Sequence, residues 1–113
     1  MTPDQFRALA LALPEAVESS HMGHADFRVG GKVFATLGYP DADHGAVTLP
    51  PDEQAYFVKA HGVAFEPAKG AWGKSGSTIV RLAKAPRKAV EAALEAAWRK
   101  RAPKRLLAAS SDR

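Results

Sequence analysis

Apolar residues near the start of the chain recur with the spacing of a helix. From residue 6 to residue 13 they occupy positions i, i+3, i+4 and i+7, which lie along one helix face. Residues 2–5, Thr-Pro-Asp-Gln, fit a capping box, in which the Thr side chain accepts from the Gln backbone N–H and the Gln side chain reaches back. Pro14 has no backbone N–H to donate the next helical hydrogen bond, so the helix ends before it. We therefore predict a helix over residues 3–13.

Residues 26–37 have the pattern of a β-hairpin. Two runs rich in β-branched and aromatic residues, 26–29 and 32–37, are separated only by Gly30-Gly31. Two glycines allow the positive φ angles at both central positions of a type I′ turn. The predicted cross-strand pairs are Val29 with Lys32, Arg28 with Val33 and Phe27 with Phe34, with Val33, Ala35 and Leu37 on the face opposite the Phe pair.

The rest of the chain alternates between short strands and helices. Pro and acidic residues at 50–53 favour a second helix start, and Gly62 suits its end. A third helix follows Pro86, and Pro103 ends it. The predicted elements outside the hairpin and the first helix are a strand over 18–22, a loop over 38–45, a strand over 46–49, a helix over 51–61, a short strand over 63–67, a Gly-rich loop over 68–76, a strand over 77–82 and a helix over 86–102.

This order of elements predicts an α+β fold. Short connections between sequential strands favour one antiparallel sheet with helices packed against one face, in two layers. At 113 residues the chain suits a single core, so we expect one domain over residues 1–106 and a flexible tail over 107–113. The chain has no cysteine, which excludes disulfides, thiolate nucleophiles and Cys-based metal sites.

The two tryptophans are predicted to differ in exposure. Trp98 continues the apolar stripe of the third helix, so we expect it to be buried. Trp72 lies among glycines in the predicted loop, so we expect it to be at least partly exposed.

Charge is unevenly distributed along the chain. Residues 1–80 contain six Lys and Arg against nine Asp and Glu, whereas residues 81–113 contain ten against three, within a net charge of +4. The C-terminal segment is therefore the expected contact surface for an acidic partner. No apolar run is long enough to span a bilayer, and no basic segment precedes an apolar run at the start. We expect a soluble cytoplasmic protein that does not bind a membrane.

One short segment resembles part of a phosphate-binding loop. Gly73-Lys74-Ser75 matches the end of that motif, but the motif needs glycine where Ala68 stands. It also needs a helix to follow, and here a strand is predicted. Nucleotide hydrolysis is therefore not expected.

The histidines suggest two further hypotheses, a metal site and a hydrolytic site. Zinc or iron binding by His21, His24, Asp26 and His44 would need convergent geometry that their spacing does not provide. A hydrolytic site of Ser19 or Ser20 with His21 and Asp26 lacks a nucleophile elbow. We expect no enzyme activity, no metal and no cofactor.

Basic residues beside an exposed aromatic suit phosphate attraction and base stacking. Such residues occur at the hairpin turn, around Trp72 and at the end of the third helix, although a solvated helix end with dipole-complementing cations explains the last group equally well. The candidate nucleic-acid-binding residues are Arg28, Lys32, Lys69, Trp72, Lys74, Arg99, Arg101, Lys104 and Arg105.

Motifs spread over residues 3–106 resemble those of a known family. They are Pro14, Glu18, His21, the run 26–37, the segments 70–73 and 80–82, Trp98 and the segment 102–106. Together they resemble the MmcQ/YjbR family of small bacterial proteins. The resemblance implies a two-layer fold like that of secretion chaperones, and the label DNA-binding protein.

Two functions follow as expectations. The first is DNA binding through a basic surface, mainly to the phosphate backbone, without catalysis. The alternative is a protein–protein interaction module, in which the partly apolar outer face of the hairpin pairs with a protein partner or with a second copy of the chain as a homodimer.

Overall fold

The computed structural model describes residues 1–111. The sheet is antiparallel throughout, with six strands in the order β1-β2-β3-β4-β6-β5, so β1 and β5 form its edges. The elements are α1 (Pro3–Leu11), β1 (Val17–His21), β2 (His24–Val29), β3 (Lys32–Leu37), β4 (His44–Thr48), α2 (Pro51–Ala60), β5 (Phe65–Pro67), α3 (Gly70–Lys74), β6 (Ser77–Arg81), the 3-10 turn η1 (Leu82–Lys84), α4 (Arg87–Arg101) and α5 (Lys104–Ser111).

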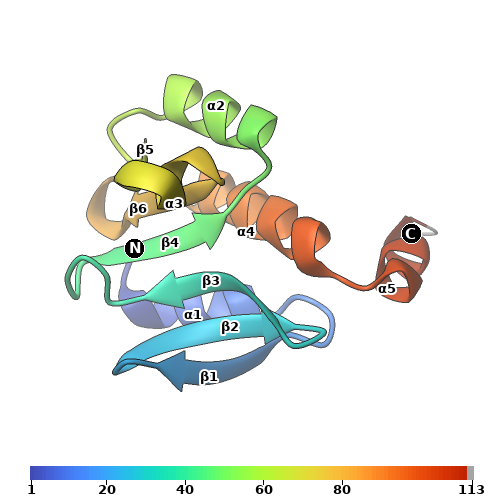
Figure 1. Cartoon of the computed structure of the whole chain (residues 1–113). Helices are drawn as coiled ribbons and strands as arrows, with labels where there is room; N and C mark the ends of the chain where they lie inside the picture. The colour runs from blue at the N-terminus through green and yellow to red at the C-terminus, as the bar shows by residue number, and fades with distance from the viewer. Residues whose placement is uncertain (112–113) are drawn as a thin grey trace.

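Two helices cover one face of the sheet. Figure 1 shows α1 and α4 lying behind the central strands, while α2 lies beyond the β6 side of β4. This arrangement confirms the predicted α+β class, with an antiparallel sheet and helices packed against it. No helix among residues 1–111 is long and apolar enough to cross a membrane.

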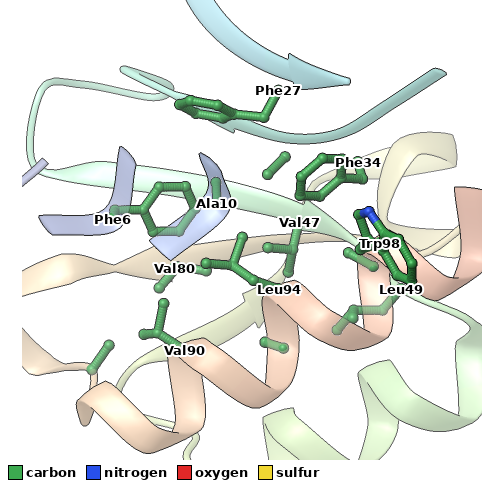
Figure 2. Close-up of a cluster of buried hydrophobic side chains, with 14 of the residues drawn as sticks. Phe6, Ala10, Phe27, Phe34, Val47, Leu49, Val80, Val90, Leu94 and Trp98 are labelled. Atoms are coloured by element: carbon green, nitrogen blue, oxygen red, sulfur yellow. The ribbon is translucent and has the colours of Figure 1, made fainter. Parts of the chain in front are cut away.

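The core lies between α4, α1 and the central strands. Val90, Leu94 and Trp98 of α4 face Phe34 and Val47 of the sheet, and all five side chains are buried (Figure 2). The Trp98 side chain is only 1% exposed, and its indole N–H donates to the Pro14 carbonyl at 2.9 Å. Trp72 is 76% exposed. The predicted difference between the two tryptophans is therefore confirmed.

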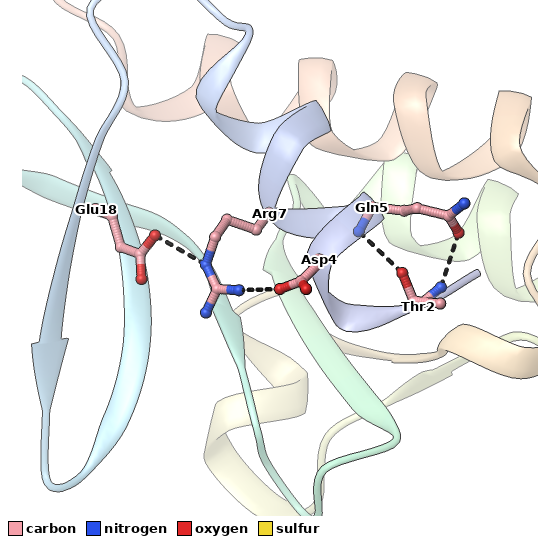
Figure 3. Close-up of polar contacts among 5 residues, drawn as sticks. All are labelled: Thr2, Asp4, Gln5, Arg7 and Glu18. Carbon is pink, nitrogen blue, oxygen red and sulfur yellow. Dashed lines mark hydrogen bonds and ion pairs between the residues drawn. The ribbon is translucent and has the colours of Figure 1, made fainter.

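The predicted capping box is present at the start of α1. The Gln5 backbone N–H donates to the Thr2 hydroxyl at 3.1 Å, and the Thr2 backbone N–H donates to the Gln5 side chain at 2.9 Å (Figure 3). The Arg7 guanidinium binds Asp4 within the helix and Glu18 on β1. Arg7 thus connects α1 to the edge strand.

The hairpin has a different register from the predicted one. Val29 pairs with Lys32 and Arg28 with Val33, as expected, but Phe27 pairs with Ala35 instead of Phe34. A β-bulge places two β3 residues opposite Phe27. Strict alternation would have turned Leu37 away from the face that Phe34 occupies, whereas the extra residue allows both to join the core. The predicted Phe pair and the predicted face of Leu37 are therefore wrong.

Two short helices replace segments without predicted structure. α3 occupies the predicted Gly-rich loop, and α5 begins after Pro103 and extends to Ser111. Leu106 of α5 packs against the core, and the Arg105 guanidinium donates two hydrogen bonds of 2.8 Å to the Glu15 carboxylate. These contacts hold a segment that the sequence alone assigns to the end of the domain and its tail. Residues 112–113 of that tail lie outside the described part of the chain.

Candidate functional site

The face of the sheet opposite α1 and α4 is hollowed into a groove of about 730 Å³. Alternation along the strands separates this face from the core: Phe27 and Val29 of β2 point into the core, whereas Arg28 between them lines the groove. The floor combines apolar side chains with hydroxyl groups. The sheet residues that line it include Val33, Thr36, Ala46, Thr48, Ser77 and Ile79.

Three cations from different elements line the groove. Arg28 comes from β2, Lys69 precedes α3, and Arg101 is the last residue of α4. Trp72 from α3 lies on the same groove. None of its lining residues in the described chain is Asp or Glu, so the groove favours an anionic ligand.

Arg28 also binds a buried carboxylate next to the groove. Asp26 is fully buried and accepts from the Nε and Nη2 atoms of Arg28 at 2.9 and 3.0 Å. The Nδ1 atom of His21 lies 2.6 Å from Oδ2 of this carboxylate, the oxygen that also accepts from Arg28 Nη2. The hydrogen bonds from Arg28, together with the contact to His21, hold the pKa of Asp26 below its usual range against the opposing effect of burial. Asp26 is therefore ionised, and it orients both Arg28 and His21.

Replacing Asp26 by asparagine should lower the free energy of unfolding by about 1 to 3 kcal/mol at neutral pH, because charge-assisted hydrogen bonds to a buried group are lost. A lowered carboxyl pKa in the folded state contributes stability above the unfolded pKa, and this contribution is lost as pH falls through the folded pKa. The difference between the wild type and Asp26→Asn should therefore shrink below about pH 4. Urea denaturation at several pH values measures this difference in the free energy of unfolding. A difference that stays constant down to about pH 2 would assign the loss to packing and not to charge.

Trp72 is held in place by contacts to the rest of the fold. The Gln54 side chain donates to the Gly73 carbonyl at 3.0 Å, and the Ser75 hydroxyl donates to the Trp72 carbonyl at 3.1 Å. The Lys100 ammonium donates to the Leu49 and Ser75 carbonyls at 3.1 and 3.2 Å, and burial lowers the pKa of Lys100. α3 is therefore anchored from α2 and from α4, although its tryptophan is exposed.

Several of the cations predicted as nucleic-acid-binding residues do not line the groove. Arg99 binds Glu95 at 3.3 Å on the exposed side of α4, and Arg105 binds Glu15. Lys32, Lys74 and Lys104 are exposed but do not line the groove. Of the nine predicted residues, the structure brings together Arg28, Lys69, Trp72 and Arg101.

Several groove residues were not predicted as a nucleic-acid site. Tyr39 is 57% exposed and packs edge-on against His24, with ring centroids 6.4 Å apart. Met22 is 93% exposed at the turn between β1 and β2. Tyr39 lies in a segment predicted as a loop, and only the fold brings it to the groove. A tyrosine in a polar Gly- and Pro-containing loop is the one sequence signal that pointed to it.

Two of the histidines lie against a carboxylate. His21 pairs with Asp26, and His44 pairs with Asp41 at 2.7 Å. Within residues 1–111 no group of three His, Asp or Glu side chains is placed to hold a metal ion.

The fold and the groove define a small two-layer α+β domain with an open, cationic sheet face. The chain belongs to the YjbR family, whose model matches residues 11–100. It is similar to the crystal structure of the Deinococcus radiodurans protein DR2400, described as a DUF419 domain, with a TM-score of 0.72 and 18% sequence identity over 86% of this chain and 75% of that one. This likeness shows the shared fold. None of the curated proteins matches the chain significantly.

Proposed function

We propose that this protein binds nucleic acid through the groove, chiefly by contacts to phosphate, and that it catalyses no reaction there. The supporting observation is the convergence of Arg28, Lys69 and Arg101 with Trp72 on a groove whose lining, in the described chain, includes no carboxylate. Phosphate groups attract such cations and release counterions on binding. The DNA-binding label that the family resemblance implies points to the same class of partner.

The three cations suit phosphate in different ways. Arg28 is fixed by Asp26, so its guanidinium loses little freedom on binding. Arg101 presents a planar guanidinium at the end of α4, and Lys69, directly before α3, adds a point charge on a flexible side chain. None of these elements is a recognition helix lying in a duplex groove, which favours backbone contacts over reading of base sequence.

In this proposal the His–Asp pair has a positioning role and not a catalytic one. A hydrolytic site would need a nucleophile hydrogen-bonded to His21. The hydrogen bonds of residues 1–111 include none from Ser19 or Ser20 to this histidine. The pair instead positions Arg28, because Arg28 and His21 bind the same Asp26 carboxylate.

The test compares two double variants of equal charge. Lys69→Gln/Arg101→Gln removes two groove cations, whereas Lys84→Gln/Lys88→Gln removes two exposed cations near the opposite end of α4. Fluorescence anisotropy with a labelled duplex should give a dissociation constant of about 1 µM or weaker for the wild type, with a steep loss of affinity as salt rises. The groove variant should reduce the log–log salt slope by about 1.8, and the control variant should leave it nearly unchanged.

Circular dichroism and thermal melting establish that each variant is folded. Equal slopes for the two variants would show that the groove is not the phosphate-binding surface. No binding by the wild type at about 50 mM salt would refute nucleic-acid binding altogether.

One observation favours a protein partner as the second candidate. Every residue of β1 is exposed, and its outer edge pairs with no other strand of residues 1–111. Val17 in this strand and Met22 directly after it expose apolar side chains. An extended segment of a partner, or β1 of a second copy, would pair with that edge. Binding of this kind would show little salt dependence, so the same titrations distinguish it from phosphate contacts.

A further inference from the structure

We infer that the ligand of the groove is a single-stranded nucleic acid, with an unpaired base stacked on Trp72 and its phosphates held by Arg101 and Lys69. This inference rests on the proposed function and specifies its substrate class. It depends on four features of the groove: a fixed exposed indole, a second aromatic ring, a partly exposed guanidinium and a floor suited to a base.

Trp72 has the properties of a stacking platform. Its side chain is 76% exposed, although the helix that bears it is anchored by Gln54 and Lys100 and closed by the Ser75 hydroxyl, which donates to the Ala71 carbonyl at 2.9 Å. Gly73, the residue after Trp72, is buried against the backbone of Ala68. The indole is thus exposed on a fixed support, and stacking a base on it orders little of the protein.

Tyr39 supplies a second aromatic ring on the same groove. Its ring is oriented by the edge-on contact to His24. The groove is also lined by Thr36, Thr48 and Ser77, whose side chains carry hydroxyl groups. Aromatic faces bind bases of any sequence, and hydroxyl groups can donate to or accept from base edges.

Arg101 lines the groove with a guanidinium that is only partly buried. Its Nε atom is enclosed by the protein, but the remaining N–H groups of the guanidinium are free to donate to a ligand. A phosphate oxygen in the groove would accept from them and would neutralise the charge of the guanidinium.

The groove selects an unpaired strand over a duplex. In a duplex both faces of each base are covered by its neighbours, so Trp72 can stack only on a base that is unpaired or has left the helix. A groove of about 730 Å³ falls within the range of small-ligand clefts, about 300 to 1,000 Å³, and therefore suits a short stretch of unpaired strand.

The experiment compares a fluorescein-labelled oligothymidylate of about twelve nucleotides with a labelled hairpin duplex of similar charge. We expect the single strand to bind the wild type at least about 10-fold more tightly. Trp72→Leu should weaken single-strand binding by about 5- to 150-fold and leave duplex binding nearly unchanged, whereas Trp72→Phe should retain most of the affinity. An oligouridylate arm shows whether the strand is DNA or RNA, because only the latter presents a 2′-hydroxyl.

Intrinsic fluorescence provides a signature that electrostatic attraction alone would not produce. Stacking should quench the wild-type emission on titration with unlabelled oligothymidylate. Trp72→Phe leaves only the buried Trp98, so its emission should not respond.

The outcomes separate this inference from the proposed function. Equal affinity for single strand and duplex, with no effect of Trp72→Leu, would overturn the single-strand inference. In that case the salt slope of Lys69→Gln/Arg101→Gln still decides whether nucleic acid binds the groove. If no oligonucleotide of either kind binds at about 50 mM salt, both proposals are wrong.

Discussion

Replacing Trp98 by alanine is expected to lower the free energy of unfolding by about 3 to 5 kcal/mol, which is the range for deleting a large buried aromatic side chain. Trp98 is 1% exposed and packs near Phe34 and Leu49, where α4 meets the sheet (Figure 2). The change also removes the hydrogen bond from the indole to the Pro14 carbonyl, which ties the end of α4 to the segment after α1. Urea denaturation followed by circular dichroism measures the loss.

Trp72→Ala is the matched control for this variant. The same side chain is removed from a site that is 76% exposed, so the free energy of unfolding should change by no more than about 0.5 kcal/mol. A destabilisation by Trp72→Ala close to that of Trp98→Ala would mean that Trp72 supports the core. The interpretation of Trp72 as a binding residue would then be untenable.

The parts of the fold that the sequence predicted well have local causes. The capping box of α1 uses side chains three residues apart, and the Gly30-Gly31 turn depends on the backbone freedom of two adjacent residues. Both glycines have positive φ, as a type I′ turn requires. The limits of α4 follow from Pro86 before it and Pro103 after it. Each of these signals acts within a few residues, so the sequence contains all of it.

The parts that were missed depend on tertiary contacts. The bulge in β3 exists because Phe34 and Leu37 both enter the core, and no turn rule specifies that. α3 has five residues, too few for a periodic pattern, and it is stabilised by Gln54 and Lys100 from other elements. α5 is held through Leu106 and the Arg105–Glu15 ion pair.

The candidate site was predicted in part because charge along a helix does not define one surface. Arg99, Lys100 and Arg101 are consecutive, and consecutive helical residues point about 100° apart. Arg99 turns to Glu95, Lys100 turns to the Leu49 and Ser75 carbonyls, and Arg101 lines the groove. The basic segment is thus divided among a surface ion pair, a structural anchor and a candidate ligand contact. Only the fold determines which cation has which role.

Gly76 lies between two residues that line the groove, Ser75 and Ser77, and packs closely against the backbone of Leu49. Gly76 has a φ of +107°, and its carbonyl accepts from the Leu49 backbone N–H at 2.9 Å. A Cβ atom at this position would lie 1.8 Å from the Leu49 carbonyl oxygen and 3.2 Å from the Lys100 ammonium. The Lys100 ammonium donates to this Leu49 carbonyl, and the hydrogen bond connects the segment after β4 to the end of α4. Gly76 therefore packs where α3, the segment after β4 and the end of α4 meet.

Gly76→Ala should lower the free energy of unfolding by about 2 to 6 kcal/mol, combining a strained positive φ with an overlap against backbone that cannot move aside. Gly31→Ala is the control, because its φ is +79° but a Cβ atom there meets nothing within 4 Å. That variant should show only the cost of the strained φ, about 1 to 2 kcal/mol. Urea denaturation of the two variants separates the steric part from the conformational part. Equal losses would show that the Leu49 carbonyl yields to the added methyl group, and the close packing at Gly76 would not be what positions α3 over the groove.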